Sequence, residues 1–209
     1  MNKIKKALIS LYDKRNLKFL LKILNKFKIE IISSGGTYKE IKKLGFNCTE
    51  VSKYTGSKEI LEGRVKTLHP KIHAGILSLR NKRSHIEDLK KNNFKEIDLV
   101  IVNFYPFEKI LNNSNRHDEI IENIDIGGPA MVRAASKNYK DVTVITNIDQ
   151  YKSLSEELIF NNGSTSLNFR EKMSEFAFNE VAHYDSIIAN YFSSRSKNDF
   201  PKKKIIIGN

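Results

Sequence analysis

Short apolar runs of strand length alternate along this chain with segments in which apolar residues recur at helical spacing. Strands are predicted for residues 5–11, 29–32, 47–51, 97–103 and 141–146. Helices are predicted for residues 17–27, 38–44, 82–93, 130–138, 149–160 and 167–192. The run 97–103 is apolar enough for burial on both faces, as in a central parallel strand. The alternation predicts an α/β fold, with a mostly parallel sheet and helices on both of its faces.

The chain favours one large domain followed by a short tail. Its 209 residues are enough to bury a sizeable core. From residue 193 to 204 the composition shifts to Ser, Lys and Asn, and residues 205–209 look like a strand cut off at its start. We therefore assign 1–192 to a single domain and 193–209 to a linker and the start of a further domain.

The formal charge of +12 comes entirely from the first half of the chain. Residues 1–104 hold 23 Lys and Arg against 10 Asp and Glu, whereas residues 105–209 hold 13 against 14. The basic residues are scattered, with no aromatic-interleaved patch or RNA-binding motif, which argues against a nucleic-acid partner. A positive surface would instead attract a phosphorylated small molecule.

The sequence gives no indication of export or of a membrane partner. No apolar run approaches the roughly 20 residues of a membrane helix. The apolar run after the basic start is too short for a signal peptide. The single cysteine, Cys48, excludes an internal disulfide and fits a reducing compartment, so a cytoplasmic location is expected.

Residues 63–77 gather basic side chains in a stretch without helical or strand periodicity before Ala74. These side chains are Arg64, Lys66, His69, Lys71 and His73. The stretch is either a solvated basic loop or an anion-binding and catalytic loop. His69 and His73 are four residues apart, but the intervening Pro70 argues against a shared helical face, so no metal site is predicted.

Polar groups also follow the predicted strands. Residues 34–37 form a Ser-Gly-Gly-Thr junction, which is either a simple capped turn or a cradle for an anion at a helix N-terminus. Tyr105 follows the strand 97–103 and is either a core residue or a proton-relaying phenol. Asp125 is either a helix cap or a partly desolvated acid. Lys137 lies near the end of the predicted helix 130–138, where a lysine commonly interacts only with the helix dipole.

Taken together, these segments resemble IMP cyclohydrolase, the N-terminal domain of the bifunctional purine-biosynthesis enzyme AICAR transformylase/IMP cyclohydrolase. The motifs that carry the resemblance occur in the family's order: Ser10-x-x-Asp13-Lys14, Ser34-Gly35-Gly36-Thr37, Gly63 to Leu77, Asn103-x-Tyr105-Pro106-Phe107, Asp125-Ile126-Gly127-Gly128 and Arg133-Ala134-Ala135-x-Lys137-Asn138. They span the chain from about residue 6 to residue 191. The Ser-Gly-Gly-Thr segment is shared with the wider methylglyoxal-synthase-like superfamily, and the long loop is specific to the cyclohydrolases.

The resemblance implies a doubly wound, methylglyoxal-synthase-like sheet and a homodimer. It implies closure of formyl-AICAR ribotide to IMP with loss of water, as a cyclic amidine hydrolase running in the ring-closing direction. No cofactor and no metal are implied for this step; 10-formyltetrahydrofolate would serve a transformylase domain, which lies beyond Asn209 in the family. One departure is Tyr12, which stands where the family usually has serine.

The site residues follow from the matched motifs. By analogy with the family, the catalytic group is Lys66, Tyr105, Asp125 and Lys137. The residues expected to bind the substrate are Ser10, Tyr12, Asp13, Lys14, Ser34, Gly35, Gly36, Thr37, Arg64, Val65, Thr67, Asn103, Ile126 and Gly127. Asp125 would orient the carboxamide, and the lysines, aided by Tyr105, would stabilise the oxyanion and move its proton.

Two other functions fit parts of the pattern. A methylglyoxal-synthase-like lyase shares the phosphate loop but does not require Lys66 or the motif that begins at Asp125. A non-catalytic regulatory domain, of the kind attached to carbamoyl-phosphate synthetase, would bind a nucleotide without turnover.

Overall fold

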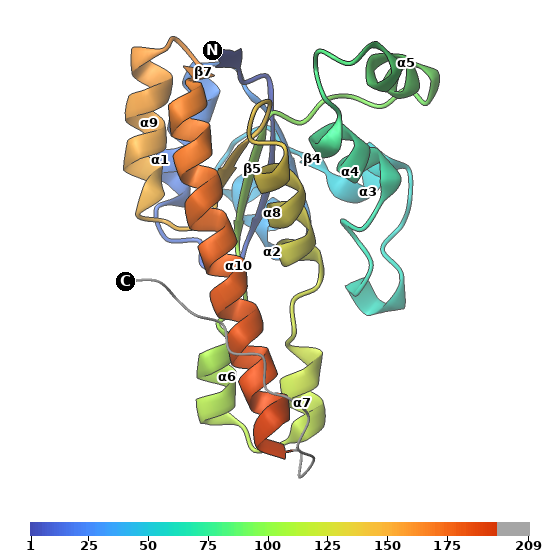
Figure 1. Cartoon of the computed structure of the whole chain (residues 1–209), viewed down its shortest axis with the longest axis vertical. Helices are drawn as coiled ribbons and strands as arrows, with labels where there is room; N and C mark the ends of the chain where they lie inside the picture. Colours follow the sequence, from blue (N-terminus) through green and yellow to red (C-terminus); the bar gives the residue numbers. More distant parts are fainter. Residues whose placement is uncertain (196–209) are drawn as a thin grey trace.

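The computed structural model describes residues 1–195 and contains two sheets surrounded by helices (Figure 1). The strands are β1 (Asn2–Lys3), β2 (Lys6–Leu11), β3 (Glu30–Ser33), β4 (Thr49–Glu50), β5 (Leu99–Asn103), β6 (Thr143–Ile145) and β7 (Ser164–Thr165). The helices are α1 (Leu17–Lys26), α2 (Gly35–Lys43), α3 (Val51–Thr55), α4 (Pro70–Leu77), α5 (Arg83–Lys91), α6 (Phe107–Asn113), α7 (His117–Glu122), α8 (Gly127–Lys137), α9 (Gln150–Phe160) and α10 (Leu167–Arg195), with a 3₁₀ turn at Leu61–Gly63.

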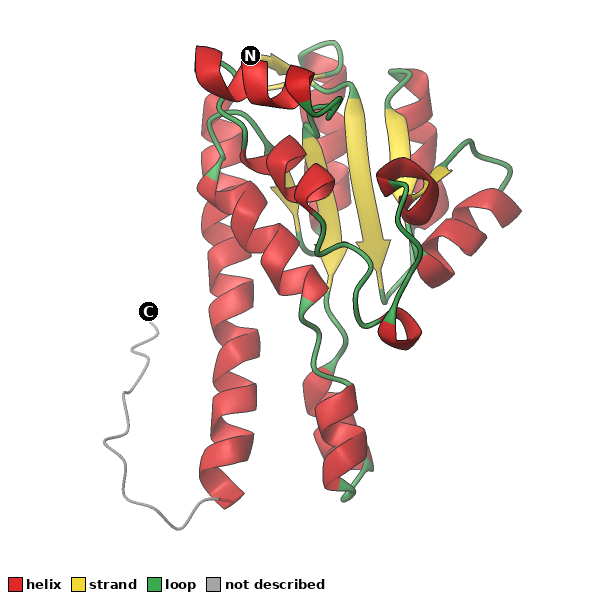
Figure 2. Ribbon diagram, turned by 90° about the vertical axis from the view of Figure 1, so that its right-hand side faces the viewer, coloured by secondary structure: helices red, strands yellow, loops and turns green. Residues whose placement is uncertain are grey.

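The main sheet has five parallel strands in the order β4-β3-β2-β5-β6. The chain therefore winds outward in one direction from β2 to β4 and in the other from β5 to β6. Right-handed crossovers then place the connecting helices on opposite faces, as Figure 2 shows. Helices α1 and α2 cover one face, and α8 and α10 cover the other. The expected doubly wound α/β fold is confirmed.

The core lies where the sequence pattern is most apolar. Residues Leu99 to Val102 of β5 are at most 1% exposed, because the strand is covered on both faces, as its apolar run predicts. A second, smaller cluster forms where α6 and α7 pack beside the lower end of α10, below the sheet in Figure 1. Its buried members are Phe107, Ile120 and Tyr184.

Four helices were not expected from the sequence. Helices α3, α6 and α7 are 5, 7 and 6 residues long, too short for their periodicity to stand out. Helix α4 covers a stretch for which an irregular loop was expected, and that expectation was wrong. Pro70 stands at the first position of this helix, where its missing N–H is harmless, and His69 caps the helix by accepting from the Lys71 amide.

The C-terminal helix α10 is longer than predicted. It runs without a break to Arg195, so the domain boundary expected after residue 192 falls inside a helix. The rest of the expected linker, and the strand expected at 205–209, lie outside the described residues. None of the helices within residues 1–195 has the length and apolar content needed to cross a membrane.

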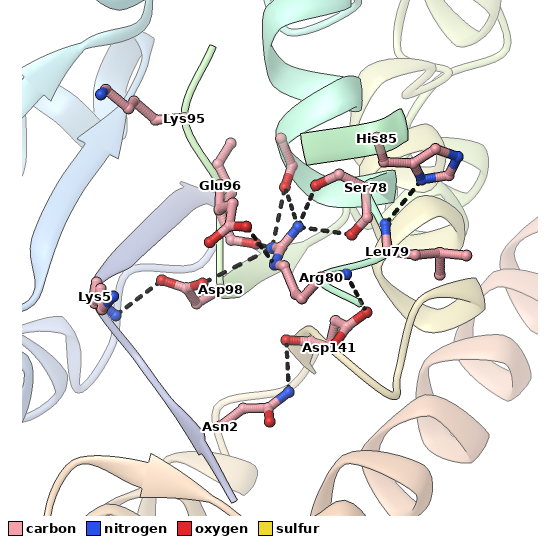
Figure 3. Close-up of polar contacts among 12 residues, drawn as sticks. Asn2, Lys5, Ser78, Leu79, Arg80, His85, Lys95, Glu96, Asp98 and Asp141 are labelled. Atoms are coloured by element: carbon pink, nitrogen blue, oxygen red, sulfur yellow. Dashed lines mark hydrogen bonds and ion pairs between the residues drawn. The ribbon is translucent and has the colours of Figure 1, made fainter. Parts of the chain in front are cut away.

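A polar network around Arg80 links the segment that follows α4 to the amino-terminal ends of the strands (Figure 3). The Arg80 guanidinium donates to the carbonyls of Gly75, Ser78 and Ile97 and lies 3.8 Å from Asp98. Asp98 in turn accepts from the amides of Lys5 and Lys6 at the start of β2. This network lies at the end of the sheet opposite the pocket described next.

Candidate active site

The principal cavity, of about 600 Å³, opens at the carboxyl ends of the central strands. Ser10 and Leu11 come from β2, Ser34 follows β3, and Asn103 ends β5. Strands β2 and β5 are neighbours from which the chain winds in opposite directions. Open α/β sheets bind their ligands at such a switch point.

Most of the predicted site residues meet in this cavity. Those that line it are Ser10, Tyr12, Lys14, Ser34, Gly35, Gly36, Thr37, Arg64, Lys66, Thr67, Asn103, Tyr105, Asp125, Ile126 and Gly127. They come from segments as far apart in sequence as residues 10 and 127. Asp13, Val65 and Lys137 are not among the lining residues.

One end of the cavity has the features of an anion site. Helix α2 begins at Gly35, and within the described chain the amides of Gly35, Gly36 and Thr37 have no hydrogen-bond acceptor. Lys66 Nζ would lie 3.5 Å from a Cβ placed on Gly35, and Lys14 Nζ 3.8 Å from one placed on Gly36. Two ammonium groups thus converge on a helix N-terminus that already favours negative charge.

The side-chain hydroxyls of Ser34 and Thr37 are not both directed at an anion. Thr37 was expected to donate to the anion, but its Oγ1 donates to the Leu11 carbonyl and accepts from the Leu11 amide, at 3.0 and 2.9 Å. Ser34 lines the cavity without capping α2 through its side chain. The backbone of residues 35–37, rather than the Thr37 hydroxyl, is therefore available to an anion.

Asn103 shapes the loop that follows β2. Its Oδ1 accepts from the amides of Tyr12 and Asp13, at 2.7 and 3.0 Å, and its Nδ2 donates to the Asp13 carbonyl at 2.9 Å. The side chain of Asn103 is thus committed to the protein, and it holds this loop at the rim of the cavity.

Asp13 turns away to pair with Arg15. Its carboxylate accepts from Arg15 Nε and from a terminal guanidinium nitrogen, at 2.8 and 2.6 Å. These hydrogen bonds hold the pKa of Asp13 below its usual value. Asp13 was expected to bind the substrate; in this structure its carboxylate pairs with Arg15 and Asp13 does not line the cavity.

Two acids that the sequence analysis did not single out pair with the basic loop. Glu122 forms a two-point ion pair with the exposed Arg64, with Nε 3.1 Å from Oε1. Glu59 lies 3.2 Å from Lys66 Nζ, and both side chains are about one third exposed. Arg64 and Lys66 are therefore each paired with an acid in this structure. No sequence pattern links residues 58 positions apart, so only the fold reveals the first pair.

Asp125 is held at the start of α8. Its Oδ1 accepts from the Gly128 amide at 2.8 Å, and its own amide donates to the Tyr184 hydroxyl at 2.8 Å. Burial raises the pKa of Asp125, while the hydrogen bonds from Gly128 and Gly127 partly oppose that rise. The two interpretations of the sequence are both correct here, because Asp125 caps a helix and is also a desolvated acid facing the cavity.

Two tyrosines form an aromatic pair at the rim. The rings of Tyr12 and Tyr105 have their centroids 5.2 Å apart, with an interplanar angle of 55°. Each is about half exposed, at 51% and 47%. Tyr105 is therefore not a core residue, and its hydroxyl is free to reach a ligand.

Lys137 and Val65 lie elsewhere. Lys137 is exposed in the last turn of α8, and ten residues of helix separate it from Gly127, or about 15 Å along the axis. The expectation that Lys137 joins the catalytic group is not met within one chain. The backbone of Val65 pairs with Ile60 instead of lining the cavity.

The histidines of the basic stretch do not form a metal site. His69 caps α4 and lies 3.2 Å from the Ser57 hydroxyl. Burial lowers the pKa of His73, whose Nε2 has no hydrogen-bond partner among residues 1–195. Residues 1–195 contain no group of three or more His, Cys, Asp or Glu side chains placed to hold a metal ion.

Comparison with known families matches the chain in two parts. The family model described as MGS-like domain matches residues 16–130, and the one described as AICARFT/IMPCHase bienzyme matches residues 135–208. The first covers residues 34–37, Lys66 and Asp125 but not Lys14, and the second begins within α8.

Curated relatives agree over nearly the whole chain. The bifunctional purine biosynthesis protein PurH of Clostridioides difficile is 47% identical over 94% of this chain, and that of Rippkaea orientalis is 47% identical over 97%. The chain spans 38% and 40% of the length of these two relatives. PurH of Rhizobium leguminosarum is 40% identical over 98% of this chain.

A solved structure has the same fold. The crystal structure of ForH superimposes with a TM-score of 0.81 and 28% identity, covering 91% of this chain and 97% of ForH. The chain therefore belongs to the MGS-like domain family and is homologous, over nearly all of its length, to the bifunctional purine biosynthesis proteins PurH.

Proposed function

We propose that this chain acts in purine biosynthesis as an IMP cyclohydrolase, closing formyl-AICAR ribotide to IMP. The homology to PurH proteins supports the pathway. The choice of reaction rests on one observation: a single cavity joins an anion site to a desolvated acid. Its volume of about 600 Å³ lies within the range that encloses a small ligand.

The anion end fits the 5′-phosphate of a ribotide. The amides of Gly35 and Gly36 and the Lys14 ammonium group would hold it, and Arg64 would join them after leaving Glu122. The heterocycle would then lie toward Asp125 and the pair formed by Tyr12 and Tyr105.

The chemistry requires proton transfer and charge stabilisation. The carboxamide nitrogen attacks the formyl carbon and loses one proton, and the formyl oxygen gains it. The attack closes the ring; the resulting hydroxyl then leaves as water with the proton of the formamide nitrogen, and a double bond forms between that nitrogen and the former formyl carbon. Both reacting groups belong to one molecule, so orientation supplies much of the rate and no cofactor is needed in this scheme.

We assign Asp125 to orient the carboxamide and accept its proton. A carboxylate with a raised pKa is a stronger base than an ordinary aspartate. Tyr105 donates to the developing oxyanion, and Lys66 adds positive charge. Lys137 can join them only from a second copy of the chain, and the homodimer implied by the family resemblance is the arrangement that would bring it there.

The test compares formyl-AICAR ribotide with the riboside that lacks the phosphate. Purified protein is expected to convert the ribotide to IMP, detected by absorbance and chromatography. The riboside should have a KM higher by about 100-fold, because several charge-assisted hydrogen bonds to phosphate are lost. Tight binding of IMP without any conversion would instead favour a regulatory domain and contradict the proposal.

A further inference from the structure

Tyr184 is tied to the active site although it lies on the C-terminal helix α10. Its hydroxyl oxygen accepts the backbone N–H of Asp125 at 2.8 Å, across 59 residues of sequence. The side chain is 5% exposed. A buried phenol therefore holds the backbone of the residue that we assign as the base.

The ring of Tyr184 is fixed by its neighbours. Its centroid lies 5.1 Å from that of Phe104 and 6.2 Å from that of Phe107, both from the segment that follows β5. These contacts leave the hydroxyl little freedom to move. The phenol is thus anchored from one side by the small cluster below the sheet and bonded to Asp125 on the other.

Asp125 lies in a short connection between two helices. The connection joins the end of α7 at Glu122 to the start of α8 at Gly127. The Gly128 amide fixes the Asp125 carboxylate, and the Tyr184 hydroxyl fixes its backbone. With both bonds in place, the carboxylate has a defined position relative to the cavity.

We propose that Tyr184 is a positioning residue that holds Asp125 in its productive orientation, an inference that rests on the proposed function. Burial, with a smaller contribution from the Asp125 charge, raises the pKa of Tyr184 to about 12. The phenol therefore stays neutral at physiological pH, and Tyr184 does not line the cavity.

Tyr191 provides a matched control. It lies two turns further along α10, and its ring also packs on Phe107, at 6.1 Å between centroids. Its hydroxyl is 2.7 Å from His117 Nδ1, and it does not line the active-site cavity. Loss of this hydroxyl removes a similar hydrogen bond from the same cluster without touching Asp125.

The experiment compares Tyr184→Phe and Tyr191→Phe in the full chain. Tyr184→Phe should lower kcat by about 10- to 100-fold with KM within about twofold, because the base shifts while the phosphate end is untouched. Exchange of the Asp125 amide with deuterium, followed by NMR, should accelerate at least about tenfold. Tyr191→Phe should leave kcat, KM and this exchange rate near their wild-type values.

Three results would overturn the proposal. They are an unchanged kcat in Tyr184→Phe, an equal loss of kcat in both variants, and an unchanged exchange rate of the Asp125 amide. The exchange measurement requires no turnover. If the wild-type protein fails to form IMP, the proposed function fails, while amide exchange still decides whether Tyr184 anchors Asp125.

Discussion

Arg64 and Glu122 form a two-point ion pair at the rim of the active-site cavity, although 58 residues separate them in sequence. Both side chains are well exposed, so solvent and salt weaken the pair. A phosphate group that binds Arg64 must displace this carboxylate. In the proposed site, Glu122 would therefore compete with the substrate for the same guanidinium.

Glu122→Gln should strengthen substrate binding. Removing the competing charge is expected to lower KM for the ribotide by about two- to fivefold, with kcat unchanged. The control is Glu119→Gln on the same helix, since Glu119 accepts from the Ser114 hydroxyl and does not line the cavity. A higher KM in Glu122→Gln alone would show that Glu122 helps to bind the substrate.

The two glycines that open α2 should respond differently to alanine. Gly35 has a φ of +53°, and Gly36 lies outside the left-handed region with no atom closer than 3.8 Å to an added Cβ. Gly35→Ala should cost about 1 kcal/mol of stability and raise KM, because L side chains rarely adopt this conformation. Gly36→Ala should change the stability and KM much less. Thermal unfolding and steady-state kinetics of the pair measure the difference, and equal effects would argue against the backbone cradle.

The pH dependence of the free energy of unfolding should reflect the titration of Asp125. Its folded-state pKa is raised by burial, so between its ordinary value and the raised value the folded protein binds a proton that the unfolded chain releases. Stability therefore falls as pH rises through that window. Asp125→Asn cannot titrate, so its free energy of unfolding relative to wild type should increase from about pH 3 to about pH 7. Urea unfolding at both pH values measures this, and a difference that decreases with pH would contradict the raised pKa.

Lys137→Ala should leave the affinity for IMP unchanged. The side chain is exposed at the far end of α8 from Asp125 and does not line the cavity. Calorimetric titration with IMP measures the affinity, and Lys140→Ala is the control on the next exposed lysine. Weaker binding in a monomeric preparation would contradict the placement of Lys137. A lower kcat at unchanged affinity would show that Lys137 reaches the reacting atoms from a second copy.

The fold could be predicted because its main strands and helices carry strong local patterns. The apolar run of β5 and the periodicity of α1 and α8 are visible in the sequence and match the structure. Helix α4 was missed because Pro70 resembles a helix breaker until its position at the helix start is known. Short helices such as α6 and α7 depend on the small cluster around Phe107 and Tyr184, which only the tertiary structure assembles.

The candidate site was predictable where it depends on local sequence patterns. Loop motifs such as residues 34–37 place backbone amides locally, so sequence alone locates the anion end. The partners of the charged groups are set by tertiary contacts, and the sequence does not show that Glu122 faces Arg64 or that Tyr184 holds Asp125. The role of Lys137 stays a prediction, because its motif matches the family while α8 carries the side chain away from the cavity of its own chain.

The most direct test of the account is the rate of IMP formation from formyl-AICAR ribotide by the wild-type protein and by Asp125→Asn at neutral pH. Asparagine can still accept the Gly128 amide, so the helix cap and the fold should survive. The account predicts conversion by the wild type and a rate at least about 100-fold lower for the variant, with an unchanged affinity for IMP. Equal rates would remove Asp125 from the chemistry, and no conversion by the wild type would contradict the proposed function.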